Sequence, residues 1–165
     1  MQRIYSPWRA EYFDKSPSSC IFCEISKNPQ NDDKNFVFYR DSRIFGVMNL
    51  YPYTPGHILL IPHDHIKSPE LLDPSIYTHL FEIAKSAMLM LYDFGADGIN
   101  MGLNIQKAAG AGIPDHLHLH LLPRFENDAN FMLSIFETRV YGHNFEQIFQ
   151  QIKTLAQKYL PKDKI

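Results

Sequence analysis

The chain has 165 residues, of which 45% are hydrophobic and 13% aromatic. This composition fits a globular protein with a sizeable core and argues against a disordered chain. The 16 basic and 18 acidic side chains leave a formal net charge of −2. That balance excludes the broad basic surface with which proteins bind nucleic acid polymers, although a small anion can still be bound locally.

The organisation of the chain predicts a single domain spanning residues 1–165, because no repeat, low-complexity tract or linker divides it. The N-terminus lacks an apolar signal core, and no later run reaches the length needed to cross a bilayer. We therefore expect a cytoplasmic protein without membrane contact. Residues 1–19 mix aromatic, charged and proline residues without periodicity, which predicts an irregular N-terminal arm.

Three strands are predicted first along the chain, at residues 36–40, 44–50 and 57–62. Short polar or proline-containing turns separate them, which favours an antiparallel meander. The third segment is almost continuously apolar, as expected for a strand in the centre of a sheet.

A long helix is predicted next, beginning at the N-cap Asp73 and the first-turn Pro74 and ending before Gly95. Residues 98–105 resemble a strand interrupted by glycine. Asn144, with Gln147 three residues later, resembles a capping box and predicts a C-terminal helix over residues 144–160. The segment 126–143 has no clear periodicity.

Between these elements lies a row of three histidines, His116, His118 and His120, that alternate with leucines. In an extended strand successive side chains point to opposite faces, so the three imidazoles share one face and the leucines share the other. Such a row indicates a site for an anion, a metal or both. One neutral imidazole can serve as a nucleophile while its neighbours hold phosphate oxygens.

Gly110 and Gly112 lie in a small-residue loop directly before the histidines. Glycines there would let backbone N–H groups approach a phosphate, although a tight turn between strands would also require them. Asn104 can add a neutral hydrogen-bond donor to the same anion, and a strand-end cap is an equal interpretation.

Cys20 and Cys23 have the spacing of a tetrahedral zinc site. Two buried cysteines acting as small hydrophobes, or a redox-active dithiol, are the alternatives. A zinc ion would need two further ligands, for which histidine is the usual residue. The candidates are His57, His63, His65, His79, His116 and His143, of which His79 and His143 are expected to face solvent.

The histidine row, with its apolar spacers, resembles the signature of the histidine triad (HIT) superfamily of nucleotide hydrolases and transferases. The segments Pro55–Pro62 and Cys20–Cys23 are similar to two further motifs of this family and occur in the family's order. The arm around Trp8 and the stretches 109–116 and 127–132 resemble the branch that contains diadenosine tetraphosphate phosphorylases.

The resemblance implies that His118 attacks an α-phosphorus and forms a covalent nucleotidyl-histidine. The chain departs from many relatives, which have Asp at the Asn49 position and Ser at the Gly112 position; the second change removes a hydroxyl that could protonate a leaving group. By the same resemblance, His120 and His57 contact the phosphate, Asn104, Gly110 and Gly112 hold its oxygens, and Asn49 lies near the ribose.

Some relatives hold a structural zinc ion with two cysteines and two histidines. The resemblance implies that the corresponding ligands in this chain are Cys20, Cys23, His65 and His116. It also implies an α+β fold, an antiparallel sheet of about five strands with two main helices, and a homodimer whose sheets join. The number of predicted strands and helices agrees with that fold.

The sequence thus predicts an enzyme that acts at the α-phosphate of a dinucleoside polyphosphate, such as diadenosine tetraphosphate, as a hydrolase or a phosphorylase. A nucleoside phosphoramidate hydrolase is the nearest alternative. A hydrolase or oxygenase that uses the alternating histidines as ligands of a catalytic metal is a second alternative. A nucleotide-binding protein without turnover is a third.

Overall fold

The computed structural model describes residues 20–126, 128, 142 and 144–161. The predicted arm over residues 1–19 and most of the unassigned segment 126–143 lie outside the described residues, as does His143. Within the described part of the chain, no helix is both long and apolar enough to cross a membrane.

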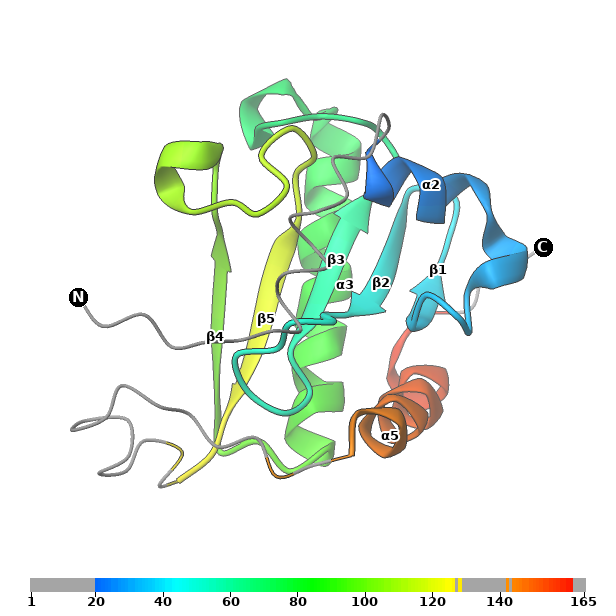
Figure 1. The fold of residues 1–165 in the computed structure, drawn as a ribbon, viewed down its shortest axis with the longest axis vertical. Coiled ribbons are helices and arrows are strands. Elements are labelled where there is room, and N and C mark those ends of the chain that lie inside the picture. The colour runs from blue at the N-terminus through cyan, green and yellow to red at the C-terminus, as the bar shows by residue number, and fades with distance from the viewer. Residues whose placement is uncertain (1–19, 127, 129–141, 143, 162–165) are drawn as a thin grey trace.

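The centre of the fold is a five-stranded antiparallel sheet with strand order β1-β2-β3-β5-β4 (Figure 1). The first three strands form the predicted meander, because each pairs antiparallel with its neighbour in sequence. The predicted α+β class and five-stranded sheet are therefore confirmed. The strands are β1 (Val37–Arg40), β2 (Ile44–Met48), β3 (Ile58–Pro62), β4 (Gly98–Leu103) and β5 (Leu119–Arg124).

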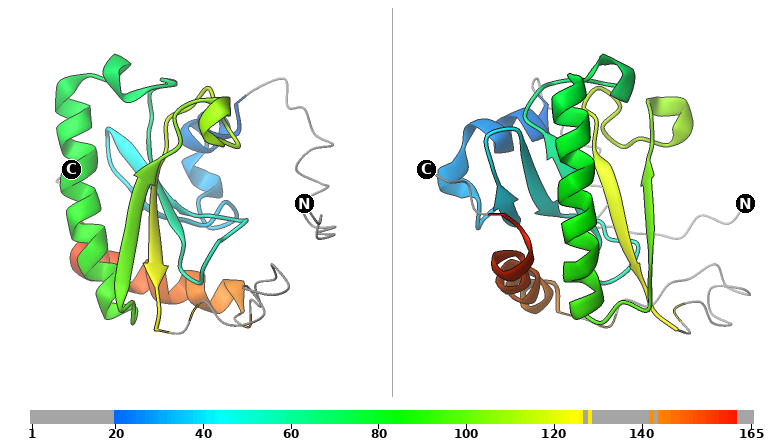
Figure 2. Two further views of the ribbon diagram at one scale, coloured as in Figure 1. Left: turned by 90° about the vertical axis from the view of Figure 1, so that its left-hand side faces the viewer. Right: turned by 180° about the vertical axis from the view of Figure 1, so that it is seen from behind.

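Two long helices, α3 (Pro74–Asp93) and α5 (Phe145–Tyr159), cover one face of the sheet (Figure 2). The predicted caps explain where they begin. The Asp73 side chain accepts a hydrogen bond from the Ser75 amide, and the Asn144 side chain accepts one from the Gln147 amide. Each cap satisfies a backbone N–H that has no partner within its helix.

The opposite face carries the short helix α2 (Ile21–Lys27), which the sequence analysis did not anticipate. Its residues Phe22 and Ile25 pack on the side chains of β1, β2 and β3 that point away from α3. Seven residues are too few to show helical periodicity, so the helix is stabilised by this packing. The remaining helical turns are the 3-10 segments η1 (Pro29–Asn31), η2 (Pro69–Leu71) and η3 (Lys107–Ala109).

The histidine segment differs in one respect from the predicted strand, because regular pairing begins only at Leu119. Upstream, the Leu117 amide donates to the carbonyl oxygen of Ile66, in the loop after β3. From Leu119 onward β5 pairs with both β3 and β4, and the β4 register runs without interruption from Leu103↔Leu119 to Gly98↔Arg124.

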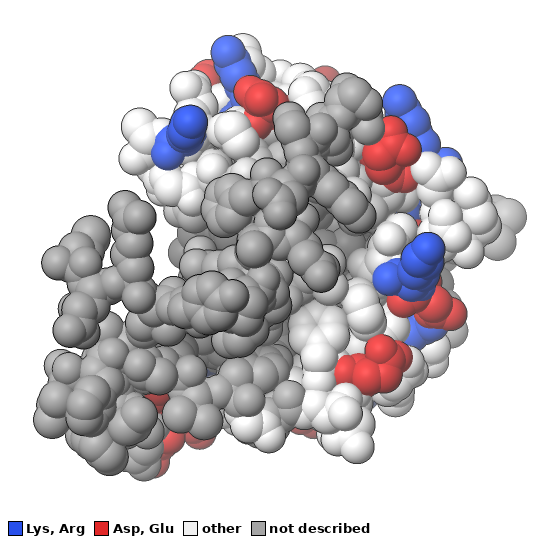
Figure 3. Space-filling model, viewed as in Figure 1, with Lys and Arg blue, Asp and Glu red and all other residues white. Residues whose placement is uncertain are grey.

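Charged residues of both signs are interspersed on the face shown in Figure 3, among the described residues. This mixture among the described residues visible there agrees with the nearly balanced charges of the sequence.

Candidate functional site

The three histidines lie together on the α2 side of the sheet, while Leu119 and Leu121 point into the core beneath α3. The rings of His118 and His120 have centroids 5.0 Å apart. Phe22 of α2 packs edge-on against His116 and His118, at 5.5 and 5.2 Å. The alternation thus places the imidazoles on one face, and α2 partly covers them.

His118 is held by its own backbone, because its Nδ1 lies 2.8 Å from the carbonyl oxygen of His116. A carbonyl can only accept, so the ring proton is on Nδ1 and the lone pair is on Nε2. Burial lowers the pKa of His118, an effect that the hydrogen bond to His116 partly opposes. A neutral imidazole with a free Nε2 is the form required of a nucleophile.

His57, at the entrance to β3, is fully buried and lies against His120, with 2.9 Å between its Nε2 and Nδ1 of His120. Burial, followed by the proximity of His120 and His118, lowers the pKa of His57 to about 3. Burial and the proximity of His118 lower the pKa of His120 to about 4. Both rings are therefore neutral near pH 7. A single proton lies between the two facing nitrogens, in a hydrogen bond that joins the rings.

The turn before His57 is fixed from both sides. Gly56 has φ +77°, and a Cβ there would lie 2.7 Å from the ring of Phe94 at the end of α3. The buried Thr54 hydroxyl donates to the carbonyl oxygen of Pro123 in β5. The turn therefore connects the end of α3 with the histidine strand and determines where His57 enters the site.

One polar atom of the site remains unsatisfied: Nε2 of His120 is buried and has no hydrogen-bonding partner within the described residues. An unpaired buried polar group costs roughly 1–3 kcal/mol, so such groups are uncommon in folded proteins. A bound anion would satisfy it.

Cys20, which precedes α2, and Cys23, within it, meet His65 and His116, and the four ligand atoms lie within 4.8 Å of one another. Cys20 Sγ lies 3.3 Å from His116 Nδ1, and Cys23 Sγ lies 3.2 Å from His65 Nδ1. Ordinary zinc bond lengths in a tetrahedron separate sulfur and nitrogen ligands by roughly 3.5 Å. The arrangement therefore fits a zinc ion.

The ring of His116 is oriented for that role by its other nitrogen, since Nε2 lies 2.9 Å from the carbonyl oxygen of Pro62 and must carry the proton. Its Nδ1 is left free to bind a metal, the common arrangement for a histidine ligand. Burial, and then the neighbouring Cys20, raise the pKa of Cys23. Binding of zinc would require both thiols to lose their protons, and the cation would stabilise the thiolates so formed.

The remaining predicted residues are dispersed around this centre. Asn49, expected near the ribose, places its amide 3.2 Å from Nδ1 of His57. Asn104 follows the Leu103↔Leu119 pair at the end of β4. Gly110, with φ +89°, and Gly112 are exposed in the loop that leads from β4 to the histidines.

Of the other histidines, His79 was expected to face solvent, and this was wrong. Its Nε2 lies 2.6 Å from the carboxylate of Asp41, which is 7% exposed. Burial alone raises the pKa of Asp41, but hydrogen bonds from Tyr39, His79 and two backbone amides outweigh burial and keep the pKa low. His63 bonds Ser26 and the carbonyl oxygen of Asp41, which links α2 to the same network.

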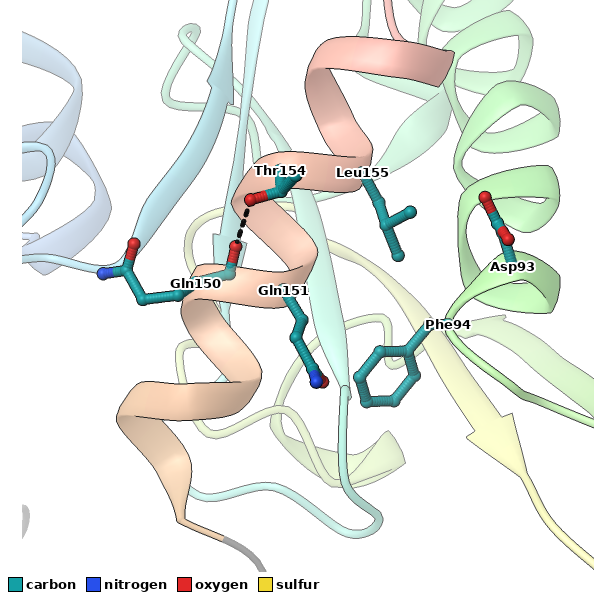
Figure 4. Close-up of a pocket in the computed structure, with 6 residues that line it drawn as sticks. All are labelled: Asp93, Phe94, Gln150, Gln151, Thr154 and Leu155. Atoms are coloured by element: carbon teal, nitrogen blue, oxygen red, sulfur yellow. Dashed lines mark hydrogen bonds between the residues drawn. The ribbon is translucent and has the colours of Figure 1, made fainter.

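A groove of about 440 Å³ lies elsewhere, between the C-terminal end of α3 and α5 (Figure 4). Asp93 and Phe94 line one side, and Gln150, Gln151, Thr154 and Leu155 line the other. No histidine lines this groove, and Asp93 is already paired with Lys158. The chemistry-bearing residues are thus on the opposite face of the sheet.

Comparison with known proteins agrees with the histidine arrangement. The HIT domain model matches residues 30–127. An AP-4-A phosphorylase from Mycobacterium tuberculosis is 30% identical over 149 residues, covering 85% of this chain and 76% of the relative. The chain belongs to the HIT domain family.

Two further proteins illustrate its range. A bis(5'-nucleosyl)-tetraphosphatase (asymmetrical) from Schizosaccharomyces pombe is 36% identical over 93 residues, covering 56% of this chain and 50% of that protein. The crystal structure of a Zn-bound histidine triad family protein from Mycobacterium smegmatis superposes with a TM-score of 0.69 at 27% identity. It covers 85% of this chain and 95% of that one.

Proposed function

We propose that the chain is an enzyme that cleaves a dinucleoside polyphosphate, such as diadenosine tetraphosphate, at an α-phosphorus through a covalent nucleotidyl-histidine on His118. The observation that carries this proposal is the hydrogen bond from His118 Nδ1 to the carbonyl oxygen of His116, which leaves Nε2 free to attack. The names of the mycobacterial and fission-yeast relatives point to the same class of substrate.

In the first step, the Nε2 lone pair of His118 forms a bond to the α-phosphorus, and the phosphorus–oxygen bond to the remaining polyphosphate breaks. The leaving nucleoside polyphosphate keeps the bonding electrons. The nucleotidylated imidazole carries a positive charge, which its Nδ1–H shares with the carbonyl oxygen of His116. Splitting one displacement into two in this way lowers each barrier.

In the second step, an oxygen of water or of inorganic phosphate attacks the same phosphorus. Nε2 of His118 departs with the bonding electrons, the proton of the attacking group is released, and the neutral histidine is restored. The N–H of His120, supported by His57, would hold a phosphate oxygen through both steps. Asn104 and the backbone near Gly110 and Gly112 would bind the other oxygens.

The chemistry of the leaving group favours a polyphosphate over a phosphoramidate. An amine leaving group needs a proton, whereas a phosphate leaving group, whose second pKa is about 6, departs as an anion near neutral pH. Gly112 has no side chain that could donate that proton.

Cys20, Cys23, His65 and His116 would hold a structural zinc ion that links α2 to the histidine segment. With four protein ligands, such a site has no open position for substrate. Among the described residues, no other group of three or more His, Cys, Asp or Glu side chains is placed to bind a metal. This disfavours the alternative in which the histidine row holds a catalytic metal.

Incubation of the protein with diadenosine tetraphosphate, with and without inorganic phosphate, tests the proposal. AMP with ATP indicates hydrolysis, and ADP with ATP indicates phosphorolysis. Absence of product under both conditions rejects the substrate class. Adenosine phosphoramidate in parallel tests the nearest alternative, and rapid quench into alkaline denaturant, in which the phosphorus–nitrogen bond survives, should trap a nucleotide on His118 in wild type.

We also propose that two copies pair through β4, the outer strand of the sheet. Its Met101 is 44% exposed, and its outer edge has no strand partner within the described chain. Exposed edges of this kind are usually covered. Sedimentation of wild type and of Met101→Lys distinguishes a dimer that the charge disrupts from a monomer.

A further inference from the structure

We propose that Asn49 is a positioning residue that fixes the tautomer of His57 and, through it, the tautomer of His120. The catalytic consequence of this inference rests on the function proposed above. The role differs from the ribose contact that the sequence resemblance implied for Asn49. It is carried by a continuous series of hydrogen bonds from Asn49 to the unpartnered nitrogen of His120.

The orientation of the Asn49 amide is set by a backbone group. The Tyr51 amide donates to Oδ1 of Asn49 at 3.0 Å, so the oxygen faces Tyr51 and the NH₂ group faces His57. From there, Nδ2 lies 3.2 Å from His57 Nδ1. Asn49 therefore presents a donor to that ring nitrogen.

A second donor reaches the same nitrogen. The Tyr53 amide donates to His57 Nδ1 at 3.2 Å, and the Tyr53 ring stacks on His57 at 5.1 Å. A backbone N–H cannot accept, so Nδ1 of His57 carries no proton. The proton of the neutral ring is consequently on Nε2.

This assignment determines the state of His120. His57 Nε2–H points at Nδ1 of His120, 2.9 Å away, so that nitrogen accepts and the proton of His120 is on Nε2. That Nε2 is the buried atom without a partner among the described residues. The low pKa of His57, about 3 because of burial, keeps a second proton off the ring near neutral pH.

The proton on Nε2 makes His120 a hydrogen-bond donor. In this tautomer His120 offers an N–H to a phosphate oxygen, whereas in the other it would offer a lone pair and repel the anion. Asn49 and Tyr53 bias the choice without contacting the phosphate. Asn49 directly follows β2 and His57 directly precedes β3, so the turn between the two strands orients the His57 ring.

The substitution Asn49→Asp tests the inference with nearly unchanged shape. Aspartate keeps the oxygen that accepts from the Tyr51 amide, but its second oxygen accepts where Asn49 donated. We expect Nδ1 of His57 to become protonated, which requires the loss of its hydrogen bond from the Tyr53 amide. Nitrogen-15 NMR of the imidazoles in the ligand-free protein reads this directly, and wild type should show proton-free Nδ1 and protonated Nε2 on both His57 and His120.

Asn31→Asp is the matched control, since Asn31 is exposed in η1 and the same change there adds the same charge. It should leave both tautomers and the rate unchanged. An Asn49→Asp spectrum in which His57 keeps its wild-type tautomer overturns the proposal. So does a wild-type spectrum with a proton on Nδ1 of either ring.

Kinetics separate this role from a ribose contact. We expect Asn49→Ala and Asn49→Asp to lower kcat about tenfold, with AMP binding and KM nearly unchanged. If Asn49 instead bound ribose, Asn49→Ala would raise KM and abolish discrimination against 2'-deoxy substrates. Because the NMR measurement needs no substrate, it decides the tautomer assignment even if diadenosine tetraphosphate is not turned over.

Discussion

The two ends of the histidine segment use opposite ring nitrogens. At one end, His116 donates from Nε2 to the carbonyl oxygen of Pro62 and presents Nδ1 to Cys20 and Cys23. At the other end, His120 accepts at Nδ1 from His57 and leaves Nε2–H without a partner. The residue type is the same, and the hydrogen-bonding partner of one ring nitrogen fixes whether the other nitrogen carries a proton or a lone pair.

His118, between these ends, combines features of both. Like His116 it donates to a backbone carbonyl, and like His120 it uses Nε2 in the proposed reaction. Because Nδ1 of His118 carries the proton, its Nε2 has a free lone pair. Under the proposed function each of the three histidines has a separate task, which single substitutions can distinguish.

The largest effect is expected for His118→Ala, which should lower the rate with diadenosine tetraphosphate at least about a thousandfold, as for removal of a covalent nucleophile. Steady-state product analysis measures the loss. Zinc content and AMP binding should be retained. A loss of less than about tenfold would place the nucleophile elsewhere.

His120→Ala should lower kcat by about a hundredfold, because removal of one preorganised donor to a developing oxyanion costs this much in enzymes. His120→Gln, which can place an N–H near the position of Nε2, should recover part of the rate. Both variants should bind zinc like wild type. Loss of zinc in His120→Ala would contradict the separation between the two ends.

Cys23→Ser should abolish zinc binding at the proposed site beside His116. Zinc at a hundredfold excess over its Kd stabilises the folded state by about 2.7 kcal/mol, so the urea midpoint should fall correspondingly in zinc buffer. Mass spectrometry under native conditions counts the metal. Ser26→Ala on the same helix is the control and should keep zinc; equal zinc in Cys23→Ser would refute the proposed ligand set.

The smallest effect is a pH dependence of the free energy of unfolding that comes from His57, beside His120. The pKa of His57 is about 3 in the folded protein, so between that value and the ordinary pKa of about 6.5 the unfolded chain binds the additional proton. The free energy of unfolding should therefore fall as the pH decreases below 6.5, by up to about 1.4 kcal/mol per pH unit.

Urea titrations at several pH values measure this slope. His57→Asn should reduce it, and the difference between the two slopes cancels contributions from the cysteines and the zinc ligands, which both proteins share. Identical slopes would mean that His57 is protonated in the folded state as readily as in the unfolded chain.

Local patterns predicted much of the fold. Period-two alternation placed the three histidines on one face, and the caps at Asp73 and Asn144 determined where α3 and α5 begin. These features depend on neighbours within a few residues. The helix α2 was missed because its stability comes from packing on three strands that follow it in sequence.

The long-range contacts of the site histidines could not be predicted from local sequence patterns. The pairing of His79 with Asp41 joins α3 to a turn far away in sequence, and neither residue has a distinctive neighbourhood. The histidine row gave no information on tautomers, because these depend on Pro62, His57 and the turn after Asn49. The family resemblance named the four candidate zinc ligands that the structure brings together. The spacing of the cysteines alone had left six histidines as candidates.

The uninterrupted register of β4 and β5 has a consequence for insertions and deletions. Removing one residue between His120 and Arg124 would shift the part of β5 on one side of the deletion by one position. On the N-terminal side, such a shift would turn His120 into the core beneath α3. The loop from Asn104 to Asp115 can change length without moving any strand pair. Length variation among homologues should therefore be absent from β5, and in that loop it should leave the proposed phosphate contacts of Asn104, Gly110 and Gly112 in place.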